Sequence, residues 1–78
     1  MKAYILINVR IGGMTEVLRH LKRLPEVKSA EMTFGEYDVI AVVETADVKA
    51  LAMLVAKDIQ VIPDVLRTVT CMAVDIDS

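Results

Sequence analysis

One stretch of the sequence, residues 33–43, limits the possible fold more than any other. It reads Thr-Phe-Gly-Glu-Tyr-Asp and continues directly into five apolar residues. Gly35 with Glu36 predicts a tight hairpin turn between a strand ending near Phe34 and a strand starting near Tyr37, because glycine adopts the positive φ angles that such turns need. The apolar run puts hydrophobic side chains on both faces of the second strand, which predicts a central place in a sheet.

Asp38 lies between this turn and the apolar run, so its carboxylate sits at a sheet margin. One interpretation is structural, with Asp38 accepting backbone N–H bonds of the turn, as Asp does in many turns. The other is functional: backbone N–H groups of the hairpin bind the carboxylate of a zwitterion, and Asp38 binds its ammonium group. The residue spacing alone leaves both interpretations open.

The length and composition predict one self-associating domain. A chain of 78 residues has material for a single core, so residues 1–78 are expected to form one domain. Hydrophobic residues make up 55% of the chain, which is high for a protein with so large a surface fraction. No apolar run approaches the roughly 20 residues of a membrane-spanning helix, and Lys2 interrupts the start before a signal-peptide core could form. We therefore expect the excess apolar surface to be buried between copies of the chain.

Charge and reactive residues exclude several function classes. The net charge of −2 argues against direct nucleic-acid binding, and the cluster of Arg19, Lys22 and Arg23 is interpreted as a solvated helix face. Cys71 is the only cysteine and lies in an apolar stretch, so it is expected to be a small core residue in a cytoplasmic protein without disulfides. His20 has no second ligand at helical spacing, and we expect no metal or cofactor.

Apolar periodicity predicts the element order strand, helix, strand, strand, helix, strand. The predicted strands cover residues 2–10, 27–34, 37–43 and 65–74, and the first helix runs from Met14 until Pro25 ends it. Thr45 or Asp47 is expected to cap the second helix. The buried stripe of that helix is predicted to contain Val48, Leu51, Ala52, Val55 and Ile59. Asp75, Asp77 and Ser78 are expected to fray at the end of the chain.

Right-handed crossovers fold this order into a ferredoxin-like α/β sandwich of βαββαβ type. The four-stranded antiparallel sheet carries both helices on one face, with the first and third strands, the most apolar ones, in the centre. The other face has no helix to cover it, and Tyr4, Leu6, Ile40 and Val42 are expected to lie there. Burying this face requires a second subunit, so the fold is predicted to be dimeric, with larger rings possible.

Several short motifs together resemble a known family. They are Gly13 at the head of the first helix, Pro25-Glu26-Val27 at its end, the turn Gly35-Glu36-Tyr37-Asp38, and Ile62-Pro63-Asp64-Val65 followed by Thr68 and Thr70. This pattern resembles the effector-binding domain of the Lrp/AsnC family of amino-acid-responsive transcription regulators, called RAM for regulation of amino acid metabolism. Those regulators carry an N-terminal helix-turn-helix domain, whereas this sequence begins directly with the first strand of the module. The chain therefore looks like a stand-alone RAM protein.

The resemblance implies that a free amino acid binds between dimers, near the hairpin turn and the start of the last strand. Gly35 and Tyr37 would supply backbone amides and a side wall, Asp38 would bind the α-amino group, and Thr68 and Thr70 would offer hydroxyls. The implied partners are the amino acid, further copies of the chain and full-length Lrp/AsnC regulators. Asp64 departs from the family, which usually has glycine after the proline, so the rim or charge of the pocket is expected to differ.

Two other classes share the fold. One is a small dimeric ferredoxin-like enzyme, such as a cofactor-independent oxygenase or a muconolactone-isomerase-like protein, with its site in the cleft between helices and sheet. The single His and single Cys are not paired with an activating base by spacing, so no catalytic set is predicted and the chain is expected not to be an enzyme. The other is the ACT-type regulatory module. The Gly-x-Tyr-Asp turn is a modest argument against assigning the chain to that class.

Overall fold

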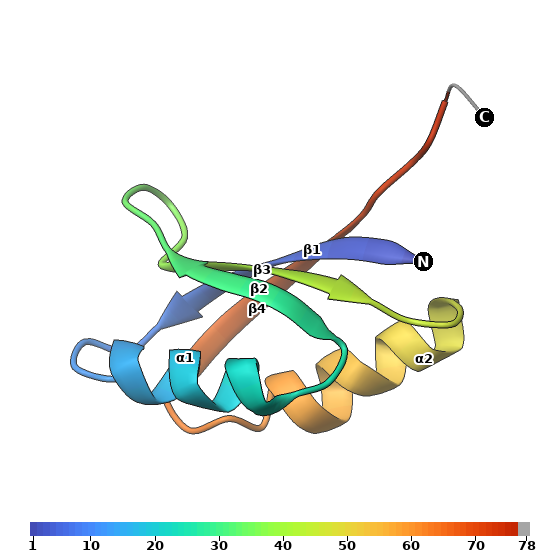
Figure 1. Ribbon diagram of the computed structural model, residues 1–78. Coiled ribbons are helices and arrows are strands. Elements are labelled where there is room, and N and C mark those ends of the chain that lie inside the picture. The colour runs from blue at the N-terminus through green and yellow to red at the C-terminus, as the bar shows by residue number, and fades with distance from the viewer. Residues whose placement is uncertain (77–78) are drawn as a thin grey trace.

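The protein is a four-stranded antiparallel sheet with its helical segments on one face, as the sequence predicts (Figure 1). The computed structural model describes residues 1–76, so the predicted fraying of Asp77 and Ser78 and the end of the predicted domain lie outside the described residues. The elements in chain order are β1 (Lys2–Val9), α1 (Met14–Arg23), β2 (Val27–Met32), β3 (Val39–Glu44), α2 (Val48–Met53), the π-helix η1 (Leu54–Ile59) and β4 (Val65–Met72). The ferredoxin-like βαββαβ order is confirmed.

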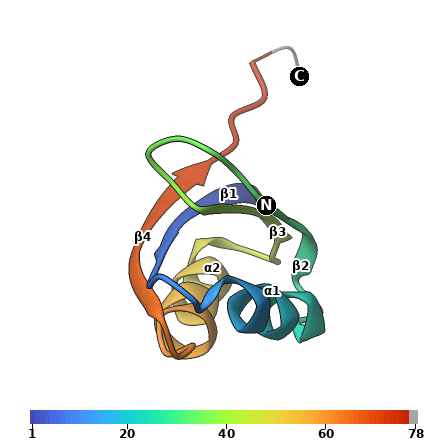
Figure 2. The same cartoon turned by 90° about the vertical axis from the view of Figure 1, so that its left-hand side faces the viewer.

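The strand order β2-β3-β1-β4 puts the two most apolar strands in the centre. Figure 2 shows the curved sheet with α1 and α2 side by side beneath it and no helix on the opposite face. Polar residues are concentrated on β2, as edge strands tolerate them because one flank faces solvent. The predicted layer arrangement is therefore confirmed.

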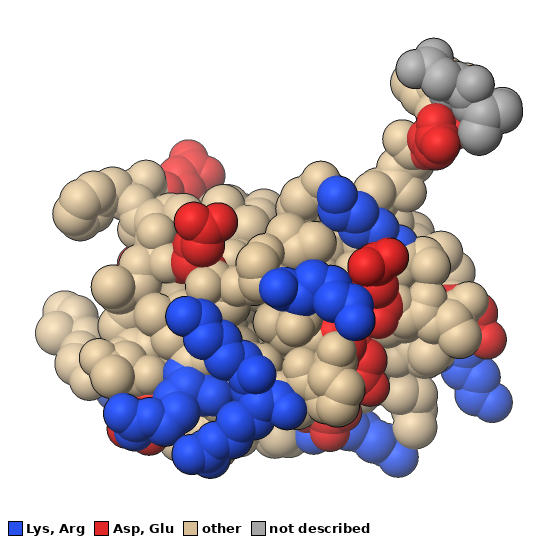
Figure 3. All heavy atoms as spheres, viewed as in Figure 1, with Lys and Arg blue, Asp and Glu red and all other residues tan. Residues whose placement is uncertain are grey.

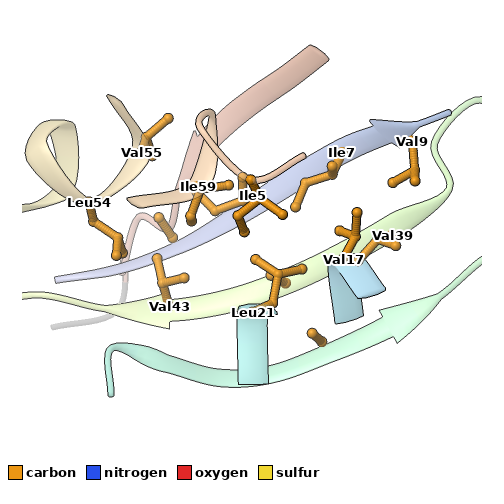
Figure 4. Packing of buried hydrophobic residues seen from close by; sticks show 14 of the residues in the cluster. Ile5, Ile7, Val9, Val17, Leu21, Val39, Val43, Leu54, Val55 and Ile59 are labelled. Atoms are coloured by element: carbon orange, nitrogen blue, oxygen red, sulfur yellow. The ribbon is translucent and has the colours of Figure 1, made fainter. Parts of the chain in front are cut away.

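Strict alternation along β1 builds the core between sheet and helices. Ala3, Ile5, Ile7 and Val9 are buried, while the residues between them point to the other face. Figure 4 shows side chains of α1 and of the second helical segment converging on the same layer. The other core residues are Val17, Leu21, Ala30, Val39, Ala41, Val43, Leu51, Leu54, Val55, Ile59 and Ile62.

The first helix ends where the sequence predicts. Its last residue is Arg23, and Leu24 has an extended ψ of 124° because Pro25 excludes the helical conformation from the preceding residue. The N-cap position is Gly13, which provides no side-chain hydrogen bond.

The second helical segment differs from its prediction. Asp47 caps α2 by accepting a hydrogen bond from the Ala50 amide, but α2 continues into a π-helix, where the Gln60 amide donates to the Val55 carbonyl at 2.8 Å. Leu54 lies three residues after Leu51 and is in the core as well, and the wider turn that follows it brings Ile59, five residues further on, to the same side. The predicted stripe is right for Leu51, Val55 and Ile59 and wrong for Val48 and Ala52, which are exposed.

The hairpin keeps its predicted centre but is not tight. Met32 pairs with Val39, the register that places Gly35 and Glu36 at the apex. Strand β2 nevertheless ends at Met32 and β3 begins at Val39, so neither strand reaches Phe34 or Tyr37 as predicted. A six-residue loop, residues 33–38, replaces the predicted two-residue turn. In this loop the Tyr37 carbonyl accepts the Thr33 hydroxyl and the Glu36 carbonyl accepts the Asn8 side-chain amide, so both carbonyls bond to side chains and not across a β2–β3 ladder.

The face without helices, which we call the open face, carries the residues predicted for it. Tyr4 pairs with Val42 and Leu6 pairs with Ile40, so the four side chains form two adjacent cross-strand pairs on the side opposite the core. Cys71 pairs with Tyr4 from the β4 side and is exposed. The prediction that Cys71 is a core residue is therefore wrong, because its strand position falls on the open face.

Candidate functional site

Residues 33–38 form a loop that rises on the side of the sheet away from the helices (Figure 1). Hydrogen bonds from the Thr33 amide to the Asp38 carbonyl (2.9 Å) and from the Thr33 hydroxyl to the Tyr37 carbonyl (2.6 Å) close its base. Gly35 has a φ of 138°, which L side chains rarely adopt, so glycine is required at the tip. The loop is thus a defined structure and not a slack connection.

Strand β1 fixes this loop at three points. The Asp38 amide donates to the Ile7 carbonyl at 2.9 Å, and the Asn8 side-chain amide donates to the Glu36 carbonyl at 2.8 Å. The third contact is the Asp38 carboxylate, whose Oδ2 accepts the Val9 amide at 2.8 Å. Val9 adjoins the irregularity in the pairing of β1 with β4, so the carboxylate satisfies an amide where the regular ladder is interrupted.

Asp38 therefore has a structural role of the kind expected, although the amide it accepts belongs to β1 and not to its own turn. The side chain is half-buried. Its second oxygen, Oδ1, has no hydrogen-bond partner among residues 1–76. Whether that oxygen binds an ammonium group stays a prediction.

The tip of the loop presents unused backbone donors. Within the described part of the chain, the amide N–H groups of Phe34, Gly35, Glu36 and Tyr37 donate to no protein acceptor. The carbonyls of Glu36 and Tyr37 do have protein donors. Successive free amides next to a carboxylate oxygen offer donors for an anionic group and an acceptor for a cationic one.

Thr68 and Thr70 lie on the other side of the sheet. They pair with Ile7 and Ile5, whose side chains are buried beneath the helices, so both threonines face the helical layer. The Gln60 side-chain amide donates from Nε2 to the Thr68 hydroxyl at 2.9 Å. Thr70 lines an open, mostly apolar groove of about 380 Å³ between β4 and the second helical segment, together with Val48, Leu51, Ala52, Val55, Ala56, Gln60 and Met72.

The five predicted site residues thus form two groups in a single chain. Gly35, Tyr37 and Asp38 share the loop, and the two threonines share the helix-facing side of the edge strand β4. Sequence reasoning missed Asn8 and Gln60, which hold the loop and Thr68. The sequence did contain a signal for Asn8, since it is a polar residue inside an otherwise apolar strand. No sequence signal pointed to Gln60.

Asp64 occupies a backbone conformation that favours glycine. Its φ is 76°, in the left-handed region, which Asp tolerates better than most other residues. The Asp64 carbonyl accepts the Arg10 amide at 2.8 Å, and the two side chains approach to 3.6 Å. Glycine would adopt this conformation without strain.

Neither a metal centre nor a membrane span is found in the described part of the chain. No group of three or more His, Cys, Asp or Glu side chains among residues 1–76 is arranged to hold a metal ion. None of the helices formed by these residues has both the length and the apolar character needed to cross a membrane.

Comparison with known proteins assigns this fold and loop to a family. Residues 2–76 match the Lrp/AsnC ligand binding domain. The crystal structure of FFRP-DM1 is 37% identical, with a TM-score of 0.90, and the match covers 94% of this chain and 97% of that one. The hypothetical protein PHS023 from Pyrococcus horikoshii is also 37% identical, with a TM-score of 0.87 and coverage of 94% and 88%.

A more distant structure is the complex of the transcriptional regulator NMB0573 from Neisseria meningitidis with L-Met. It has 18% identity and a TM-score of 0.90, and the match covers 99% of this chain but 51% of that one, so it shows the fold alone. No curated protein matches the chain. On the match over residues 2–76 and the two structures at 37% identity, the chain belongs to the Lrp/AsnC ligand-binding domain family.

Proposed function

We propose that this chain is an amino-acid-binding and oligomerisation module of the Lrp/AsnC type, which catalyses no reaction and reads no DNA by itself. The observation that carries the proposal is the composition of the loop at residues 33–38. Its free amides from Phe34 to Tyr37 suit the α-carboxylate of an amino acid, and Asp38 Oδ1 suits the α-ammonium. Membership of a ligand-binding family supports the same assignment.

The two groups of predicted residues support a site shared between subunits. In one chain the loop lies on the open-face side, whereas Thr68 and Thr70 face the helices. A threonine of a neighbouring subunit would therefore contribute its hydroxyl to the proposed site, and not a threonine of the same chain. The uncovered pairs Tyr4–Val42 and Leu6–Ile40 support dimerisation through the open face, since that face exposes apolar side chains. The same face would let this chain join full-length regulators.

A screen of the twenty amino acids by thermal shift tests this function, starting with L-methionine, the amino acid in the Neisseria complex. Binding raises the unfolding temperature in a concentration-dependent way because the ligand stabilises only the folded assembly. Asp38→Asn retains an oxygen for the Val9 amide but loses the charge, so it is expected to weaken binding roughly tenfold or more.

The matched control is Asp58→Asn, which removes an exposed carboxylate from η1, far along the chain from the loop. It is expected to leave the response unchanged. If none of the amino acids shifts the unfolding temperature, the proposed function is wrong. If Asp38→Asn responds as the wild type does, the ammonium role of Asp38 is wrong.

A further inference from the structure

A second concave surface, which we call the α1 groove, lies beside the first helix. It has a volume of about 590 Å³ and is lined by Thr15, Leu18, Arg19, Lys22, Arg23 and Met32. Figure 3 shows Lys and Arg side chains gathered over the part of the surface that α1 occupies in Figure 1. The groove shares no residue with the loop at residues 33–38 or with Thr68 and Thr70.

The helical period separates this surface from the core. Val17 and Leu21 are fully buried against the sheet. Thr15, Leu18 and Lys22 recur at spacings of three and four residues, so they line a neighbouring face of the same helix. Leu18 packs partly against the core and Met32, at the end of β2, is 62% exposed, so the groove has an apolar floor beneath its cations.

The charges around the groove are unbalanced. Residues 15–28 contain four of the nine Lys and Arg residues of the chain but two of its eleven acidic residues. Glu16 neutralises Arg19 by an ion pair. Lys22 and Arg23 form no ion pair within residues 1–76. A locally positive surface therefore stands out on a chain whose net charge is negative.

We propose that the α1 groove binds an acidic, amphipathic segment of a partner protein. Carboxylates of the segment pair with Lys22 and Arg23, and an apolar side chain enters between Leu18 and Met32. Methionine suits such a floor because its unbranched side chain adapts to different partners. Amphipathic segments that place an apolar face into a groove are a common mode of protein recognition.

The same observations favour a protein over a nucleic acid. Affinity for nucleic acid grows with the number of phosphates neutralised, and three cations, one of them paired with Glu16, supply few such contacts. The apolar floor contributes nothing to a phosphate backbone but does contribute to a side chain that leaves water. Tighter binding of a phosphate-bearing probe than of an acidic peptide would therefore contradict the proposal.

The test measures fluorescence polarisation of a labelled synthetic helical peptide that carries glutamates beside a leucine stripe. The comparison probes are the same peptide with every glutamate replaced by glutamine, and an oligothymidylate of equal charge. The wild type is expected to bind the acidic peptide, and the double variant Lys22→Glu/Arg23→Glu is expected to bind it roughly tenfold or more weakly. Met32→Ser is expected to weaken binding several-fold.

The control variant Lys49→Glu/Lys57→Glu makes the same change in net charge on the second helical segment and is expected to bind as the wild type does. Because all four of these lysine and arginine side chains are exposed, circular dichroism is expected to show folded protein throughout. Equal binding of the glutamine peptide, equal loss in both double variants, no binding of the acidic peptide, or tighter binding of the oligothymidylate would each overturn the proposal. These readouts do not depend on amino-acid binding at the loop.

Discussion

Gly13 and Asp64 lie so close together that a Cβ atom on Gly13 would be 2.5 Å from the Cβ of Asp64 and 2.7 Å from its Oδ2. This contact joins the start of α1 to the residue that precedes β4. It also explains why α1 begins without a capping side chain, because any residue larger than glycine would meet Asp64. The left-handed backbone of Asp64, with φ at 76°, fixes the position of its side chain against the glycine.

Gly13→Ala is expected to destabilise the fold by about 1–3 kcal/mol through overpacking. Asp64→Gly removes the opposing Cβ and relaxes the left-handed backbone, so the double variant is expected to recover most of that loss. Urea unfolding of the four proteins measures the coupling. Gly12→Ala is the control, since among residues 1–76 no atom outside its two chain neighbours lies within 4 Å of its added Cβ. Its cost, due to φ at 90°, is not expected to respond to Asp64→Gly. Additive effects at Gly13 and Asp64 would contradict the contact.

The second helical segment contains one buried and one exposed apolar side chain whose truncation is expected to have different costs. Leu54 is 2% exposed and Val48 is 54% exposed. Leu54→Ala is therefore expected to lower the free energy of unfolding by about 2–4 kcal/mol, and Val48→Ala by less than about 1 kcal/mol. Chemical denaturation of both variants decides the point. A larger loss for Val48→Ala than for Leu54→Ala would contradict the burial of these two side chains.

These two regions show what the sequence could and could not predict. The element order could be predicted because its signals are local in the sequence. They are the alternation along β1, the proline that ends α1 and the apolar run of β3. The π-helix at residues 54–59 could not be predicted in this way, since an apolar stripe at α-helical spacing gives no sign of a wider turn. The same limit applies to Asp38: its place beside the turn was evident, but its bond to the Val9 amide joins residues 29 positions apart. Cys71 was misplaced because apolar composition does not reveal which face of an edge strand a residue occupies.

Two substitutions of Asp38 separate its structural role from a role in binding. Asp38→Ala leaves the partly buried Val9 amide without its acceptor and is expected to cost about 1–3 kcal/mol of stability. Asp38→Asn keeps an acceptor and is expected to cost less than about 1 kcal/mol. Thermal and urea unfolding without ligand give both values. Equal losses in the two variants would mean that the charge, and not the hydrogen bond, stabilises the loop.

The open face is expected to hold subunits together. Leu6→Lys places a charge at the centre of the pairs Tyr4–Val42 and Leu6–Ile40 and is expected to convert the oligomer to folded monomers, because burying an unpaired charge is costly. Ile11→Lys is the control, since Ile11 is fully exposed in the loop before α1. Sedimentation velocity measures the subunit number. A wild-type protein that remains monomeric at high concentration would refute assembly through this face.

Two-dimensional amide NMR, during titration with the amino acid that gives the largest thermal shift, determines whether the tip of the loop at residues 33–38 holds the ligand. We expect the amide resonances of Phe34, Gly35, Glu36 and Tyr37 to move most, since these free donors would bind the α-carboxylate. Saturating shifts confined to other residues, with these four resonances unmoved, would contradict it.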